Sequence, residues 1–172
     1  MTPKEQRNFY PKFLADELER FRKNPELNKL PNTKITDFFH LIRTIWIISN
    51  KDYQERFWVR QELPMRGDNY METMETFLGD GEAVLEANKA DRVSMTPKQR
   101  EMLQKLYGIV EDFDGDPNPL CPIDTIFDKP DNDAEIISQP EWQKIGEYAK
   151  LVYEELSGDD LDAWEKSKSS RT

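Results

Sequence analysis

Acidic side chains are the residues of this chain whose type and spacing could do chemistry. They concentrate in residues 111–135 and 154–165, where Lys129 is the only basic residue. Carboxylates can bind a metal ion, move protons or pair with a basic surface. Like charges at this density repel one another, and a basic partner would relieve the repulsion and associate quickly. The residues are Glu111, Asp112, Asp114, Asp116, Asp124, Asp128, Asp131, Asp133 and Glu135, then Glu154, Glu155, Asp159, Asp160, Asp162 and Glu165.

The order Asp112, Asp114 and Asp116 around Gly115 invites a comparison with a calcium-binding loop. An EF-hand needs ligands at positions 1, 3 and 5, Gly at position 6 and a bidentate Glu at position 12. Counted from Asp112, Gly115 stands at position 4 and Ile123 at position 12, so the pattern fails where the geometry matters. The sequence therefore predicts a solvated acidic segment and no calcium site.

Other catalytic groups are scarce. His40 is the only histidine and Cys121 the only cysteine. Neither has a second His or Cys nearby to complete a metal site, and a partly buried structural role is expected for His40. Carboxylate pairs recur throughout, so no pair stands out as a general acid and base. We expect no catalytic residue, no metal and no cofactor.

Charge is distributed unevenly along the 172 residues. The formal net charge is −10, with 12 basic and 8 acidic residues in 1–60 and 12 basic and 26 acidic residues in 61–172. Nucleic acids and anionic membranes need a positive surface, so neither is expected as a partner. The single cysteine and the lack of an apolar signal at the N-terminus favour a cytoplasmic location.

Hydrophobic periodicity predicts an all-α fold, a compact bundle of about six helices. One domain is expected over residues 1–165, followed by a frayed C-terminal tail at 166–172. A long Pro-rich acidic loop is expected over residues 114–138, in which residues 123–127 also fit a short strand. The expected helices span about 10–24, 33–50, 51–62, 70–90 with a break at 79–81, 96–113 and 138–158.

Two helix starts carry capping signals. Thr96-Pro97-Lys98-Gln99 combines an N-cap, a proline at the first helical position and a capping box. Ser138 and Glu141 have the spacing of a second box. The segment 33–50 is apolar on most of its circumference, so as a helix it is expected to be the buried centre of the bundle. Its run of β-branched Ile residues also fits a strand, but apolar positions at i, i+3, i+4 and i+7 favour the helix.

Three segments share a distinctive placement of aromatic residues. They are Phe38-Phe39-His40-Leu41-Ile42-Arg43-Thr44-Ile45-Trp46, Glu55-Arg56-Phe57-Trp58 and Met74-Glu75-Thr76-Phe77. Through them, residues 35–113 resemble small bacterial immunity proteins, the antidotes of contact-dependent inhibition and related polymorphic toxin systems. The resemblance implies a cytoplasmic protein that binds and blocks one cognate toxin domain, often a basic nuclease, and has no catalytic residues of its own.

The first hypothesis is therefore a monomeric inhibitor whose acidic surface covers a basic cleft on a protein partner. An exposed Trp beside acids would add a binding hot spot. The alternative is a helical adaptor of a larger complex, which would use an exposed apolar patch. A carboxylate-metal hydrolase is a third hypothesis, opposed by the placement of the acids in a Pro-rich loop. The predicted partner-binding residues are Asp112, Asp114, Asp116, Asp124, Asp128, Asp131, Asp133, Glu135 and Trp164.

Overall fold

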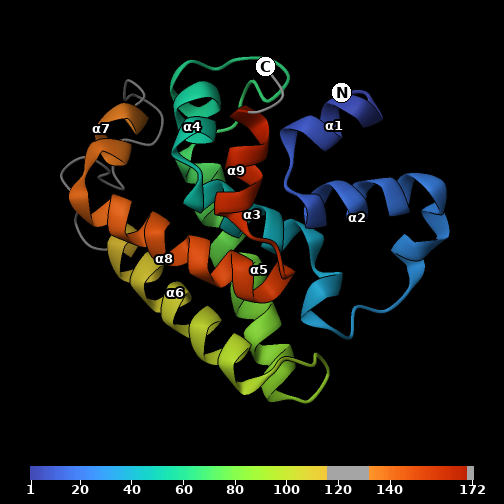
Figure 1. Cartoon of the computed structure of the whole chain (residues 1–172). Coiled ribbons are helices and arrows are strands. Elements are labelled where there is room, and N and C mark those ends of the chain that lie inside the picture. The colour runs from blue at the N-terminus through green and yellow to red at the C-terminus, as the bar shows by residue number, and fades with distance from the viewer. Residues whose placement is uncertain (116–131, 170–172) are drawn as a thin grey trace.

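The computed structural model describes residues 1–115 and 132–169 (Figure 1). These residues form helices joined by short connections, and the one strand-like feature among them is an isolated bridge between Lys34 and Ser94. The all-α prediction is confirmed. The α-helices are α1 (Pro3–Phe9), α2 (Lys12–Lys23), α3 (Phe39–Ser49), α4 (Lys51–Tyr53), α5 (Tyr70–Lys89), α6 (Pro97–Gly115), α7 (Asp133–Ser138), α8 (Pro140–Ser157) and α9 (Leu161–Ser169). Shorter 3-10 helices are η1 (Pro25–Lys29) and η2 (Ile35–Asp37), and η3 (Gln54–Val59) is a π-helix.

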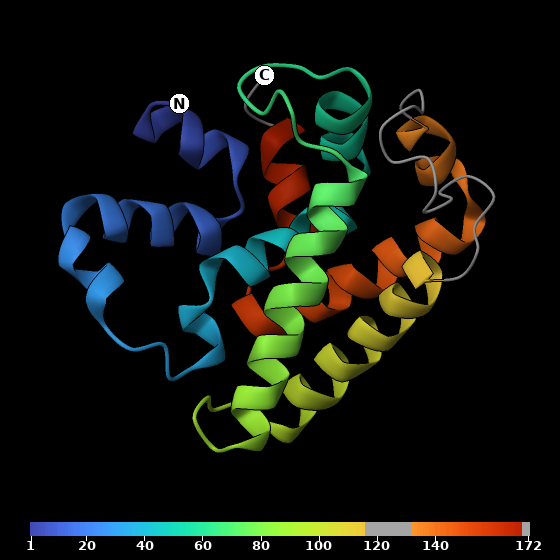
Figure 2. The ribbon, with the colours of Figure 1, turned by 180° about the vertical axis from the view of Figure 1, so that it is seen from behind.

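Helix α3 forms the centre of the bundle, as its apolar circumference predicts. Leu41, Ile42, Ile45 and Ile48 are all buried. Helix α8 crosses α3 on one side in Figure 1, and α5 packs against it on the side seen in Figure 2. Helix α6 packs against both α5 and α8. The four helices bury a continuous core because each turns an apolar stripe inward.

Helix α5 is continuous, and the predicted break at residues 79–81 is wrong. A Cβ atom on Gly81 would lie 3.1 Å from the ring of Tyr107 on α6, so this glycine permits close contact between the two helices. A Cβ on Gly79 would meet nothing within 4 Å. Glycine lowers helix propensity by only about 1 kcal/mol, which the packing of a long amphipathic helix outweighs.

The capping box at Thr96 is confirmed. The Gln99 N–H donates to the Thr96 hydroxyl over 3.1 Å, and the Thr96 N–H donates to the Gln99 side chain over 2.9 Å. Helix α1 begins with the same arrangement between Thr2 and Glu5, and the prediction missed it. Pro11 is accordingly the N-cap of a separate helix, α2.

The predicted capping box at Ser138 is wrong. Helix α8 begins at Pro140 after Gln139, and no side chain caps it. The Ser138 hydroxyl donates instead to the Glu135 carbonyl over 2.8 Å, at the end of α7. Helix α7 itself lies in a stretch predicted to be irregular. The predicted short strand at residues 123–127 lies outside the described residues.

The C-terminal end differs from the predicted tail. Gly158, at φ 79°, ends α8 as predicted, because only glycine adopts this left-handed conformation readily. Helix α9 then continues to Ser169 and includes the first residues of the predicted frayed segment. The remainder of that segment, residues 170–172, lies outside the described residues.

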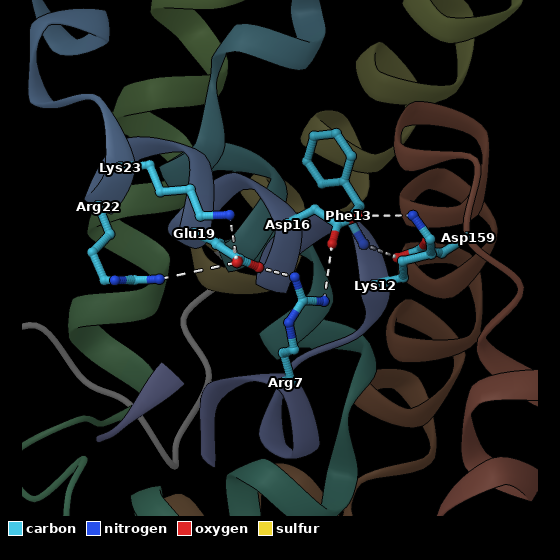
Figure 3. A network of polar contacts seen from close by, with 8 residues as sticks. All are labelled: Arg7, Lys12, Phe13, Asp16, Glu19, Arg22, Lys23 and Asp159. Atoms are coloured by element: carbon cyan, nitrogen blue, oxygen red, sulfur yellow. Dashed lines mark hydrogen bonds and ion pairs between the residues drawn. The ribbon is translucent and has the colours of Figure 1, made fainter. Parts of the chain in front are cut away.

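Helices α1 and α2 form an arm at the side of the bundle (Figure 1). The rings of Phe9 and Tyr10 lie against Trp46 of α3, with centroids 6.0 and 5.4 Å away. Asp159, between α8 and α9, accepts the Phe13 backbone N–H over 2.9 Å (Figure 3). It also accepts the Tyr153 hydroxyl over 2.7 Å. Pro11 provides no side-chain cap, so Asp159 caps α2 from the other end of the chain.

Within the described residues, the apolar helices are too short or too interrupted by charge to cross a membrane.

Candidate functional site

The two ends of the predicted acidic segment meet at Tyr70, the first residue of α5. Asp114, in the last turn of α6, accepts the Tyr70 hydroxyl over 2.9 Å. Asp133, the first residue of α7, accepts the Tyr70 backbone N–H over 3.1 Å. One residue of α5 thus fixes the position of both helix ends, and the acidic side chains of these ends are presented by ordered structure.

The acidic residues of this end differ in burial. Asp133 is only 5% exposed, so its carboxylate has a structural role at the start of α5. Asp114 is half-buried, whereas Asp112 and Glu135 are exposed. The exposed pair is available to a partner without disturbing the helix ends.

The other predicted positions divide into two groups. Asp116, Asp124, Asp128 and Asp131 lie outside the described residues. Trp164 lies on α9, where its ring is half-buried and meets Trp46 edge-on at 6.0 Å.

Trp164 is thus not the exposed side chain that its polar neighbours in the sequence predict. The Lys168 ammonium covers it, 3.4 Å from the ring centroid, and burial lowers the pKa of this lysine. The contacts of Trp164 with Trp46 and Lys168 involve none of the acidic residues around Tyr70.

Further exposed carboxylates line helices α5 to α8. In the described part of the chain, none of them lies within 4 Å of a Lys or Arg nitrogen. On α5 the spacing of Glu75, Glu82 and Glu86 places all three on one face of the helix. The exposed carboxylates concerned are Glu72, Glu75, Glu82, Glu86, Glu101, Glu111, Asp112, Glu135, Glu141 and Glu147.

At the contact between α5 and α6, two of these carboxylates change the pKa of a neighbouring tyrosine, Tyr107. Burial raises the pKa of Tyr107 above its ordinary value, and the negative charges of Glu111 and Glu82 raise it further. Glu111 is on α6 and Glu82 on α5, so carboxylates from both helices border the same aromatic ring. The uncompensated negative potential is therefore a property of a surface that two helices form together.

The N-terminal arm shows the opposite arrangement. Arg7 pairs with Asp16 over 3.2 Å and with Glu19, and Lys12 pairs with Asp16 over 2.6 Å (Figure 3). Lys23 approaches Glu19 to 3.0 Å. The carboxylates of the arm are therefore largely neutralised by the arm itself.

A polar cluster around Arg43 was not predicted. The Arg43 guanidinium, on the otherwise apolar α3, donates to the hydroxyls of Tyr10 over 3.1 Å and Tyr53 over 3.2 Å. The Tyr53 hydroxyl donates in turn to Asp68. Burial opposes the charge of Arg43, but Tyr10, Tyr53 and Asp68 outweigh it and raise its pKa. The signal in the sequence is one arginine within the most apolar segment of the chain.

A cavity of about 360 Å³ lies beside this cluster, between α3 and α5. His40 lines it and is exposed, so the expectation of a partly buried histidine is wrong. Residues 1–115 and 132–169 contain no group of three or more His, Cys, Asp or Glu side chains that could hold a metal ion. The cavity therefore offers hydrogen-bonding groups of mixed charge and no metal centre within those residues.

Comparison of the chain with protein-family models, with curated proteins and with solved structures found no match.

Proposed function

We propose that this protein is an inhibitory binding protein of the immunity type, which blocks a basic toxin domain, of the nuclease class, through an acidic surface. The observation that carries the proposal is the set of exposed carboxylates on α5 to α8 that have no ion-pair partner among the described residues. Unpaired charges of one sign destabilise the protein that carries them. Basic side chains of a partner would remove that cost and gain charge-assisted hydrogen bonds.

The proposed mechanism is occlusion of the toxin's active site. A nuclease holds substrate phosphates with Lys and Arg, and carboxylates can occupy the same cations and exclude the nucleic acid. Asp112 and Glu135, at the two ends of the acidic segment, would make the first contacts. Their backbone is fixed by the hydrogen bonds of Asp114 and Asp133 to Tyr70, and such preorganisation lowers the entropic cost of binding.

In this proposal the protein acts in the cytoplasm as a monomer. Its partner is a protein, and neither nucleic acid nor membrane is bound. It performs no catalysis and needs no cofactor, because inhibition requires only that the partner's cleft be covered.

The proposal expects a toxin domain to be encoded beside the gene of this protein, and the test is calorimetric titration against that domain. The double variant Asp112→Lys/Glu135→Lys should lower the affinity by about 100-fold, and its affinity should depend less on salt concentration. The control, Glu26→Lys/Asp52→Lys, makes the same change of charge at exposed positions outside α5 to α8 and should bind like the wild type. Equal affinities and equal salt dependence for the two double variants would refute the acidic mechanism.

One observation favours the alternative of a helical adaptor. Val59, Leu63 and Met71 are exposed apolar side chains close together in the sequence. An adaptor that self-associates through them would elute as an oligomer in size-exclusion chromatography with light scattering. A monomer that binds the toxin domain would favour the inhibitor.

A further inference from the structure

Exposed apolar side chains are concentrated between η3 and the first turn of α5. Six large hydrophobic residues of the described chain are exposed, and three of them, Val59, Leu63 and Met71, lie within residues 59–71. Leu63 is the most exposed of the six, at 76%. Isolated surface leucines are common, so the significance of Leu63 depends on how firmly the chain holds it outward.

The connection that carries Leu63, residues 60–69, is held from its inside by Gln61. The Gln61 amide donates to the carbonyls of Phe57, Trp58 and Asp68 at 2.8–3.0 Å. Its side-chain oxygen accepts the Gly67 N–H over 2.8 Å. Gln61 also has a positive φ of 54°, a costly conformation for a residue other than glycine. Such strain persists only where the surroundings enforce it, and these hydrogen bonds do so.

Further contacts attach the same connection to the bundle. The Met65 side chain packs on the core, and its sulfur accepts from the Arg43 guanidinium over 3.9 Å. Asp68 accepts from Tyr53, and Asn69 caps α5 by accepting the Glu72 N–H over 2.9 Å. The chain therefore turns one apolar side chain inward at Met65 and another outward at Leu63. The outward position of Leu63 is therefore fixed by the contacts that hold residues 60–69.

Two arginines stand on either side of Leu63 in the sequence. Arg66 is exposed, and no carboxylate of the described residues lies within ion-pair distance of it. Arg60 is also exposed and approaches Glu62 to 3.5 Å, but Glu62 is held more closely by Arg56, at 2.8 Å. In a protein of net charge −10, the exposed Leu63 therefore has an exposed arginine three residues away on each side in the sequence.

We infer that Leu63, with Arg60 and Arg66 beside it, is a docking site for a protein partner that offers an apolar pocket edged by carboxylates. An aliphatic anchor supplies affinity by filling the pocket, and the guanidinium groups select a rim of opposite charge. Preorganisation of the connection by Gln61 lowers the ordering cost of binding. This site goes beyond the proposed function, because it does not require the partner to be a toxin or to be basic elsewhere.

The connection is followed directly by Tyr70 of α5, which donates hydrogen bonds to Asp114 of α6 and Asp133 of α7. A single partner can therefore contact both surfaces, with carboxylates facing Arg60 and Arg66 and cations facing Asp112 and Glu135. The two contacts would respond to different mutations, which allows them to be tested separately.

Photo-crosslinking in the source cell tests the site with the full chain. The crosslinker p-benzoylphenylalanine replaces Leu63 in one variant and Leu151, an exposed leucine of α8, in the control. Position 63 should give one discrete adduct, mapped to an apolar, carboxylate-rimmed segment, which position 151 does not give. Arg60→Glu/Arg66→Glu should abolish the adduct. Once the captured partner has been purified, the variant Leu63→Asp should bind it about 30-fold more weakly than the wild type does.

The inference is overturned if position 63 gives no discrete adduct, gives the same adducts as position 151, or maps to a basic segment. Binding to phosphatidylglycerol vesicles that depends on Leu63 would also overturn it, in favour of a membrane contact. If the position 63 variant does not fold, protection of Leu63 in carbene footprinting of the wild-type complex decides the question in its place.

These outcomes separate the two proposals. A partner that is not a toxin domain would refute the proposed function and leave this docking site intact. A toxin domain that binds Leu63→Asp as tightly as the wild type would do the reverse.

Discussion

The N-terminal arm and helices α5 to α8 contain acidic residues at similar density but use them differently. In the arm, Asp16, Glu17 and Glu19 each have a Lys or Arg nitrogen within 4 Å. On α5 to α8, the exposed carboxylates have no such partner among the described residues. The comparison shows that acidic composition does not by itself define a binding surface. What distinguishes the two regions is whether the protein satisfies its own charges.

The order of residues produces this difference. In α2, Lys23 follows Glu19 by four residues, and Asp16 follows Lys12 by four, so opposite charges become neighbours on the helix surface. In α5, Glu86 follows Glu82 by four residues, and the same geometry brings like charges together. One helical periodicity therefore neutralises the arm and concentrates negative potential on the bundle.

The largest loss of stability is expected from a variant of Asp159, the residue that attaches the arm to the bundle. Asp159→Ala removes the cap of α2 and leaves the Tyr153 hydroxyl without its acceptor. The free energy of unfolding should fall by about 2 kcal/mol in urea denaturation. Proteolysis should then cut the arm before the bundle. Asp162→Ala, an exposed residue of α9, is the control, and equal losses for both variants would contradict a specific role for the cap.

A smaller loss is expected from disturbing the ion pairs of the arm. Glu19→Gln removes the carboxylate that Arg7 and Lys23 share. The network is partly exposed, so the cost should be about 0.5–1 kcal/mol at low ionic strength and less at high salt. Glu75→Gln on α5 serves as the matched control, and it should not destabilise the protein. A loss of equal size in both variants would remove the distinction between the two regions.

The smallest effect is expected from Glu82→Gln, where a like charge is removed. The pKa of Tyr107 is raised by burial and by Glu111 and Glu82, so this variant should bring it closer to 10 in an ultraviolet titration. A raised tyrosine pKa stabilises the folded state at lower pH, and that stability is lost as the pH rises through the folded-state value. The variant should therefore show a shallower loss of stability at alkaline pH. An unchanged titration would place Glu82 away from Tyr107.

Local signals in the sequence predicted much of the fold. The start of α6 was correct because Thr96, Pro97 and Gln99 act within one turn. Helix α1 was missed although Thr2-Pro3-Lys4-Glu5 repeats the same pattern. The predicted break in α5 was wrong because Gly81 serves the close packing against Tyr107, which lies on another helix. Contacts of this kind have no signature in a local stretch of residues.

The candidate site was predictable only in part. Acid density predicts Asp112, Asp114, Asp133 and Glu135 as partner-binding residues, but it could not show that Tyr70 brings the ends of two helices together. Nor could it separate the buried Asp133 from the exposed Glu135. Leu63 was overlooked because its exposure depends on the hydrogen bonds of Gln61, and an isolated leucine carries no pattern.

The capping of α2 by Asp159 has a consequence for biosynthesis. Asp159 stands 146 residues after Phe13, the residue whose N–H it accepts. A nascent chain leaves the ribosome from its N-terminus, so α2 emerges long before its cap exists. The N–H groups at the start of α2 therefore stay open to water until residue 159 has been translated. An intact cap on α2 therefore requires a chain that extends at least to residue 159. A chain released before that point has an uncapped arm that proteases can cut.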